Sequence, residues 1–310
     1  MSVTLTHDGA WRRGMDRLRR IVAACGGPAG CLGAAIVLAL LVLAVFATWI
    51  APHDPLRVSL PDQLLEPGGD FPFGTDQSGR DVLSRVIWAS RASLAVAGVA
   101  VLIGLALGVT LGLSAGFFRG GWAEQAIMRL LDAVAAIPVL IWAIALVGIF
   151  GIREIEIGPF TFGNEVKLML MLGLLYVPTL ARITYTSAAS ESQANYVAAR
   201  RLQGVPGWRI MLSDVLPNCL SPVIVQATLM LALGIIIEAS VSFVGLGVQP
   251  PTPSWGNMLA DARNYLLSGE WWLSVFPGAA ISVTVIGFNL LGDGLRDRLD
   301  PRHALPTVAG

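Results

Sequence analysis

Residues 196–217 have the sequence YVAARRLQGVPGWRIMLSDVLP and lie between two segments that are apolar enough to cross a bilayer. The stretch carries three arginines, and Gly204-Val205-Pro206-Gly207 interrupts apolar residues that recur at helical spacing on either side. Glycine adopts turn conformations that bulkier residues resist. The pattern therefore predicts a helix, a sharp turn and a second helix in a basic loop between two membrane spans.

The composition of the whole chain indicates an integral membrane protein. The 310 residues are 55% hydrophobic and 14% charged, with a mean hydropathy of +0.68, so a soluble globule would expose a very large apolar surface. A span needs roughly 20 apolar residues, and five charge-free windows reach or approach this length: 31–51, 92–118, 133–152, 215–237 and 271–292. A sixth span is expected at about 166–187, where the long side chain of Arg182 reaches the headgroups. We predict an all-α membrane protein with six transmembrane helices.

The basic residues set the expected orientation of these spans. If the N-terminus is inside, 14 of the 21 basic residues fall on the cytoplasmic side and seven on the other side. Because cytoplasmic loops carry an excess of Lys and Arg, both termini are expected in the cytoplasm. The same topology places residues 196–217 in the cytoplasm, in a multi-pass protein of the cell inner membrane.

The chain divides into four expected parts. Residues 1–29 form a cytoplasmic tail in which Trp11, Met15, Leu18 and Val22 share one face of an amphipathic, interfacial helix; a cleaved signal peptide is the alternative. Residues 30–91 hold the first span and an external segment. Residues 92–292 form a core of five spans with the loop 190–217, and residues 293–310 form a cytoplasmic tail.

The external segment 52–91 begins as a Pro- and Gly-rich loop and is expected to end in a helix on the outer surface. Thr75, Asp76 and Ser78 are good helix N-caps, and Asp81 lies four residues before Arg85, so the two are expected to pair. Two interpretations stay open for this segment: structural support for the spans, or a landing surface for an extracytoplasmic protein.

Ionisable residues inside spans are candidates for function because they are costly there. Asp132 is three residues after Arg129, which predicts a local pair at the cytoplasmic end. Glu238 is expected near the outer surface, either as a cap or polar partner or in a transport pathway. Gly104, Gly108, Gly112 and Gly116 form one face of a span, which predicts close packing of another helix, with a gate as the alternative.

Several function classes lack their sequence signals. A P-loop needs a lysine after a glycine-rich run, and the single lysine, Lys167, is not in one. The three histidines are dispersed outside the spans, so we expect no His-based metal site, and no catalytic constellation is apparent. The formal charge is zero, so nucleic-acid binding is not expected.

Four motifs, in this order, resemble one family of transport proteins. They are FGTDQSGRD at 73–81, the pattern Tyr-Val-x-Ala-x-Arg-x-x-Gly at 196–204 followed by Leu216-Pro217, QPPTPSWG at 249–256, and LGDGLRD at 291–297. Together they resemble the second permease subunit of bacterial ABC importers of the dipeptide, oligopeptide and nickel group, over nearly all of the chain after about residue 30. Two positions depart from the family loop: Ala198 stands where glutamate is common, and Arg200 where alanine is usual.

The resemblance implies a fold, partners and a set of site residues. It implies the type I ABC importer permease fold, a second permease subunit, two ATPase subunits that bind ATP and Mg, an extracytoplasmic binding protein, and no cofactor or catalysis in this chain. It implies coupling to the ATPase through Tyr196, Ala199, Arg201, Leu202, Gly204, Val205, Trp208, Arg209 and Pro217, with Ala199, Leu202 and Val205 as an apolar docking surface. It also implies a role for the periplasmic motif residues Gly74, Thr75, Asp76, Gly79, Arg80 and Asp81.

The implied cargo is a short peptide or a similar small solute, with nickel, glutathione or opine-like solutes as alternatives. An ion-coupled secondary transporter would favour paired carboxylates or broken helices at the midplane, and neither is evident. A membrane scaffold or sensor is the third hypothesis, in which the loop 196–217 serves only as an interaction site.

Overall fold

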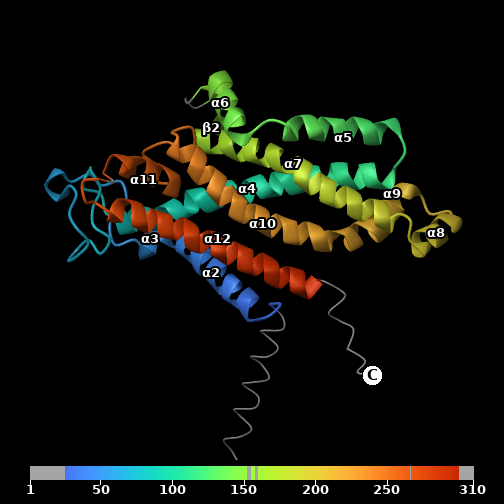
Figure 1. Cartoon of the computed structure of the whole chain (residues 1–310), viewed down its shortest axis with the longest axis horizontal. Coiled ribbons are helices and arrows are strands. Elements are labelled where there is room, and N and C mark those ends of the chain that lie inside the picture. Colours follow the sequence, from blue (N-terminus) through green and yellow to red (C-terminus); the bar gives the residue numbers. More distant parts are fainter. Residues whose placement is uncertain (1–24, 152–154, 158–159, 266, 300–310) are drawn as a thin grey trace, which may run out of the picture.

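The computed structural model describes residues 25–151, 155–157, 160–265 and 267–299. This part of the chain is an elongated helical bundle, with one two-stranded sheet at its side (Figure 1). Five helical segments are long and apolar enough to span a membrane: α2 (Pro28–Val45), α4 (Val82–Phe117), α7 (Asn164–Glu191), α10 (Leu216–Phe243) together with the short elements before it, and α12 (Trp272–Leu299).

Shorter elements connect these spans. They are α3 (Ala47–Ile50), the 3-10 helix η1 (Leu60–Asp62), the antiparallel strands β1 (Ile155–Ile157) and β2 (Phe160–Phe162), α8 (Asn195–Leu202), α9 (Gly207–Ile210), the π-helix η2 (Met211–Val215), α11 (Trp255–Ala262) and the 3-10 helix η3 (Arg263–Tyr265). The expected amphipathic helix of the N-terminal tail lies outside the described residues.

The span expected at about 166–187 is the helix α7, whereas the span expected at 133–152 is bent. Residues 133–152 begin in the last turn of α5 (Trp122–Ala135) and continue into α6 (Val139–Phe150), and the two helices meet at 86°. Pro138 is the N-cap of α6, and a proline both lacks an N–H group and excludes the residue before it from helical geometry. Six spans are therefore counted in the described chain only if this bent pair is taken as one span, and the window 133–152 is not a single straight helix.

The glycine face of α4 packs directly on α7, as predicted. A Cβ atom built at Gly104, Gly108, Gly112 or Gly116 would lie 2.7, 2.8, 2.2 or 2.7 Å from the nearest atom of α7. Such distances leave no room between α4 and α7 for a side chain at these four positions. The four glycines therefore allow the two helix backbones to approach closely, which is how small residues drive helix association in membranes.

The helix expected to begin near Thr75 begins later and is not separate from the span. Its N-cap is Asp81, whose carboxylate accepts hydrogen bonds from the backbone N–H groups of Leu83 at 3.2 Å and Ser84 at 3.1 Å. From Val82 the helix α4 continues without a break for 36 residues. At 1.5 Å per residue this is about 54 Å, longer than the ~30 Å hydrocarbon core, so α4 extends beyond the membrane instead of a surface helix turning into it.

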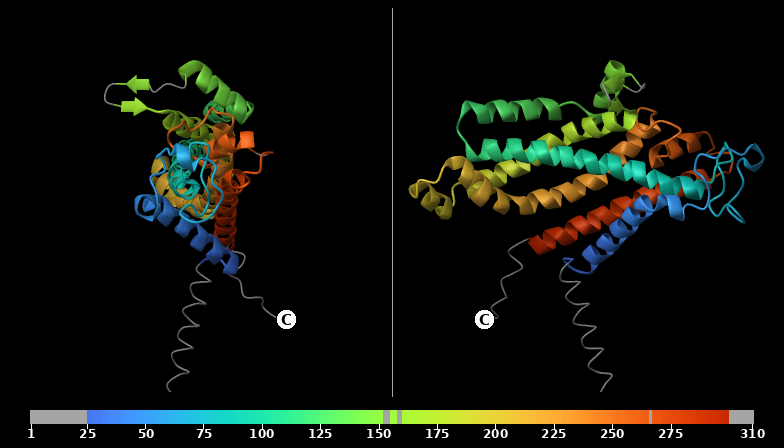
Figure 2. Two further views of the ribbon diagram at one scale, coloured as in Figure 1. Left: turned by 90° about the vertical axis from the view of Figure 1, so that its left-hand side faces the viewer. Right: turned by 180° about the vertical axis from the view of Figure 1, so that it is seen from behind.

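Opposite ends of the bundle carry the two sets of predicted site residues. Figure 1 shows α8 and α9 at one end, here called the α8 end, and α11 with the loops that precede α4 at the other, the α11 end. The views in Figure 2 show that α2 begins, and α12 finishes, on the side directed toward the α8 end. The described ends of the chain thus point in the direction that the expected topology requires.

Candidate functional site

The loop 195–215 has the predicted form of helix, sharp turn and helix. α8 ends at Leu202, Gly204 has a φ of +74°, and α9 begins at Gly207. This left-handed backbone conformation is one that most L-residues adopt only with strain. No atom lies within 4 Å of a Cβ built at Gly204, so the glycine is required by the backbone angle and not by crowding.

Buried apolar residues attach this loop to the bundle. Val197 of α8 and Ile210 of α9 are completely buried in a cluster with Leu113 and Phe117 of α4 and Ala188 of α7. α8 therefore lies against the ends of α4 and α7.

The docking surface predicted on α8 is smaller than expected. Val205, predicted to share it with Ala199 and Leu202, is half-buried and packs against the buried cluster. The chain reverses at Gly204 and turns Val205 inward, where its N–H donates to the carbonyl of Arg200 at 3.3 Å. The exposed apolar surface therefore keeps Ala199 and Leu202 but not Val205.

Tyr196 links α8 to the two spans on either side of the loop. Its hydroxyl donates to Glu191 Oε2 of α7 at 2.7 Å and accepts from Asn218 Nδ2 of α10 at 3.1 Å. Burial and the hydrogen bond to the Glu191 carboxylate raise the pKa of Tyr196, so its hydroxyl stays protonated as a donor. One side chain thus joins the end of α7 to the beginning of α10.

The remaining predicted coupling residues are exposed at the α8 end. Leu202 is 90% and Trp208 60% exposed, and Ala199, Arg209 and Pro217 also face outward. The guanidinium of Arg201 lies 5.4 Å from the centre of the Phe117 ring, within the range of a cation–π contact.

A hollow beside α8 is lined by Ser192, Gln193, Ala194, Ala198, Arg201 and Leu202. It adjoins the exposed apolar surface described above. This end of the bundle therefore presents apolar and basic side chains around a concave surface.

The motif at 73–81 is largely buried and joins several elements at the α11 end. Thr75 is 0% and Asp76 5% exposed, and Gly74 and Gly79 have φ values of +74° and +71°. The indole Nε1 of Trp272, in α12, donates to the Thr75 carbonyl at 3.1 Å. These contacts favour structural support over a landing surface for this motif.

Asp76 is the charged centre of that motif. Its Oδ2 accepts from Arg80 Nε at 2.7 Å and from Arg85 Nη1 at 2.5 Å, and Asp261 of α11 lies 3.8 Å from both arginines. The expected pair of Asp81 with Arg85 is not formed, because Asp81 caps α4 and contacts His53 Nδ1 at 3.2 Å.

Asp132 and Glu238 both bind other helices. Asp132 pairs with Arg182 of α7 and not with Arg129 as predicted, because α5 lies alongside α7 and brings the two side chains together. Glu238 is 0% exposed, and its carboxylate accepts from Ser93 of α4 at 2.8 Å and from Ser242 at 2.7 Å. Glu238 is thus a buried polar partner that joins α10 to α4.

Other contacts at the α8 end carry no local sequence signal. Asp214, Glu191 and Asn218 are 14, five and 22 residues from the residues of α8 that they bind. Only the fold brings them together. Within the residues that the structure describes, no group of three or more His, Cys, Asp or Glu side chains could hold a metal ion.

Comparison with known proteins identifies the family. The model of the family described as "Binding-protein-dependent transport system inner membrane component" matches residues 108–304. The chain is 42% identical over 281 residues to the di/tripeptide transport system permease protein of Pseudomonas aeruginosa (88% of each chain), and 42% identical over 278 residues to the dipeptide transport system permease protein of Escherichia coli (87% of this chain and 88% of the relative). It is 36% identical over 293 residues to a glutathione transport system permease protein of Pectobacterium atrosepticum (94% of this chain and 90% of the relative). With several apolar helices and a match of this extent, the chain belongs to the family of inner membrane components of binding-protein-dependent transport systems, as a permease subunit of an ABC importer.

Proposed function

We propose that the protein moves short peptides across the inner membrane into the cytoplasm, driven by ATP hydrolysis in separate subunits. Relatives described as di/tripeptide and dipeptide transport permeases, each aligned over most of the chain, support peptides as the cargo. ATP and Mg bind in the partner subunits, and this chain carries no cofactor and no catalytic residue.

The exposed surface of α8 is the observation that carries this proposal. Leu202 is almost fully exposed beside Arg201, and Arg209 of α9 is also exposed, although a large apolar side chain gains free energy when it is buried. A short helix with an exposed apolar face is suited to insertion in a groove of a partner. An ATPase subunit with an acidic rim around an apolar cleft fits this surface, and closure of the ATPase would displace α8.

The remaining partners follow from the family. A second permease subunit completes the transmembrane part, two ATPase subunits bind on the cytoplasmic side, and an extracytoplasmic binding protein delivers the solute. The two-to-one excess of basic residues supports a cytoplasmic location for α8 and for both termini. The direction of α2 and α12 toward the α8 end agrees with that topology (Figure 2).

The test is reconstitution of the complex. The tagged chain is purified with its bound partners from gently solubilised membranes and placed in vesicles, with the binding protein and a labelled dipeptide added to the side opposite α8. Uptake that requires ATP and stops when Leu202 is replaced by aspartate supports the proposal. Leu202→Asp inserts a charge at an exposed position, so the bundle itself is expected to fold.

Other outcomes separate the alternatives. ATP-driven uptake of glutathione, a nickel chelate or an opine-like compound without dipeptide uptake would keep the importer and replace the cargo. Uptake that persists without ATP would favour an ion-coupled secondary transporter. A chain that binds partners but transports none of these solutes would favour a scaffold.

A further inference from the structure

The residue Asp214 lies in η2, a single π-helical turn at the point where the loop becomes a membrane span. α9, η2 and α10 together form one continuous apolar segment, Gly207–Phe243. Single π turns are rare inside helices and occur frequently at functional sites. Within this segment, the polar side chains of α8 first make contact at η2, through Asp214.

Asp214 makes contacts with α8 through both its side chain and its backbone. Its Oδ2 accepts from Arg200 Nε at 3.1 Å. Its carbonyl oxygen accepts from Asn218 Nδ2 at 2.9 Å and lies 3.5 Å from the hydroxyl of Tyr196. Tyr196 and Arg200 are four residues apart and therefore lie on one face of α8, so this face is attached to a single turn of the next helix.

The other attachments of α8 are few. The helix has eight residues, of which Val197 alone is buried, and a helix this short does not hold its conformation without tertiary contacts. The side chains of Arg200 and Asp214 are 38% and 22% exposed, so their ion pair contributes little to the stability of the bundle. A charge-assisted hydrogen bond is nevertheless directional, and it restricts how α8 can rotate about its contact at Val197.

We propose that Arg200 and Asp214 are positioning residues for coupling. Their ion pair holds α8 to the π turn, so that a displacement of α8 moves the beginning of α10 and does not merely rotate α8 in place. This inference rests on the proposed function, because it requires an ATPase that displaces α8. Arg200 stands where the family resembled by the loop usually has alanine, so the family pattern does not supply this link.

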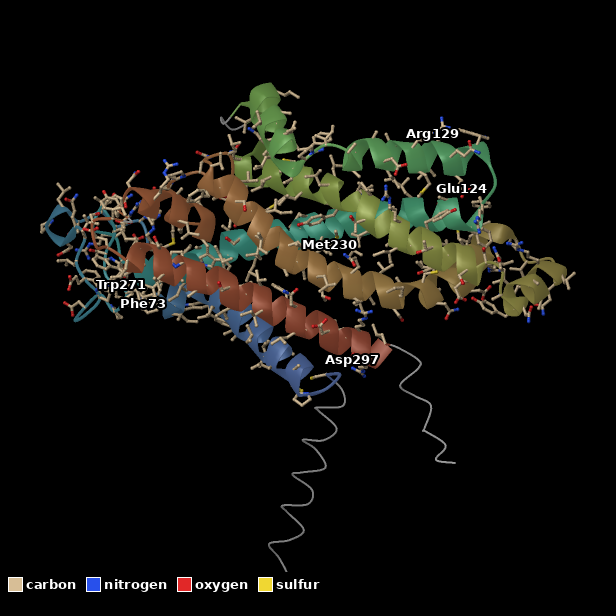
Figure 3. The ribbon with its side chains drawn as sticks, in the orientation of Figure 1. Phe73, Glu124, Arg129, Met230, Trp271 and Asp297 are labelled. Carbon is tan, nitrogen blue, oxygen red and sulfur yellow. The ribbon has the colours of Figure 1, made fainter. Side chains whose placement is uncertain are left out.

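The test measures solute taken up per ATP hydrolysed by the complete complex in vesicles. The variants are Arg200→Gln, Asp214→Asn, the double variant, and the charge exchange Arg200→Asp with Asp214→Arg. The matched control is Arg129→Gln, which removes the same charge from an exposed position on α5 (Figure 3). Co-purification of the ATPase with each variant verifies that the complex assembles.

Complexes with either single variant are expected to hydrolyse ATP at the wild-type rate and to lower uptake per ATP by about threefold or more, in line with the small energy of a partly exposed ion pair. The double variant is expected to be no worse than either single variant, because both remove the same contact. The charge exchange is expected to restore part of the loss. A role limited to folding would lower the amount of assembled complex and leave uptake per ATP unchanged.

Two results would overturn the inference in different ways. Wild-type uptake per ATP in both single variants, or additive losses without recovery in the charge exchange, would refute the role of the pair and leave the proposed function intact. A wild-type complex without any ATP-driven uptake would refute the proposed function, and the inference with it.

Discussion

Replacing Gly112 by alanine tests whether the close contact of α4 and α7 holds the bundle together. A Cβ atom at Gly112 would lie 2.2 Å from the carbonyl oxygen of Ala181 and 2.8 Å from Cβ of Thr184. A carbon atom approaches an oxygen to about 3.3 Å in helix–helix contacts, so the two helices would have to separate locally by about 1 Å. The obstacle is backbone, which cannot rotate away as a side chain would.

The expected loss of stability in Gly112→Ala follows from the free-energy cost of overpacking. One extra methyl group in a close-packed site destabilises by about 1–3 kcal/mol, and the separation also weakens the contacts at the neighbouring glycines, since packing is what holds membrane helices together. We expect Gly112→Ala to lower the free energy of unfolding by about 2–3 kcal/mol. This corresponds to a fall in Tm of roughly 5 °C for a chain of this size.

Gly98 provides the control on the same helix. A Cβ at Gly98 meets no atom within 4 Å, and alanine is favoured over glycine in a helix by about 1 kcal/mol, so Gly98→Ala is expected to be neutral or stabilising. The assay is thermal unfolding of the purified full-length chain in detergent, followed by tryptophan fluorescence. Equal melting temperatures for the two variants would show that the glycine contact does not contribute the predicted stability.

Three further predictions test the α8 end, the topology and the α11 end. Gly204→Ala should reduce uptake per ATP more than Gly204→Asn, because asparagine tolerates the left-handed conformation that strains alanine by about 1–2 kcal/mol; equal effects would mean that the angle at the turn is unimportant. In intact cells an impermeant thiol reagent should label Leu267→Cys, between η3 and α12, but not Leu202→Cys of α8. The two leucines are fully and 90% exposed, and labelling in the reverse pattern would invert the topology. Asp76→Asn should lower the free energy of unfolding by about 3 kcal/mol, because it leaves two buried arginine contacts uncompensated. Asp261 is 38% exposed and 3.8 Å from the same arginines, so Asp261→Asn should cost less than about 1 kcal/mol. Similar melting temperatures for the two variants would contradict the buried network.

The sequence predicted what depends on local periodicity. Charge-free windows located four of the five straight spans, those of α2, α4, α10 and α12, because crossing a membrane needs an apolar stretch of fixed length. The four glycines of α4 predicted a packing face, and the turn at Gly204 followed from the residues around it. In each case the relevant residues are close together in the chain, so their pattern is visible without the fold.

Besides the bend at Pro138 and the late start of α4, the errors concern which side chains contact one another in the fold. Arg85 was paired with the nearest carboxylate in helical spacing, Asp81, but it binds Asp76, because Asp81 is needed at the N-terminus of α4. Asp132 binds across to α7, and Val205 turns inward. These outcomes depend on which helices become neighbours, and a single sequence does not specify that.

The packing of α4 on α7 also explains how α8 can act on the bundle. The cluster that holds Val197 includes Leu113 and Phe117 of α4 and Ala188 of α7, and a Cβ at Gly116 would lie 2.9 Å from Cβ of Ala188. The surface beneath α8 is therefore the end of the most extensive helix–helix contact in the described chain, and such a contact resists deformation. The beginning of α10 is attached to α8 by polar contacts and to the same buried cluster by Val215 and Cys219, and its displacement does not require the glycine contact to open. A displacement of α8 is thus expected to move α10 over a fixed α4–α7 pair, and loosening that pair by Gly112→Ala should reduce coupling as well as stability.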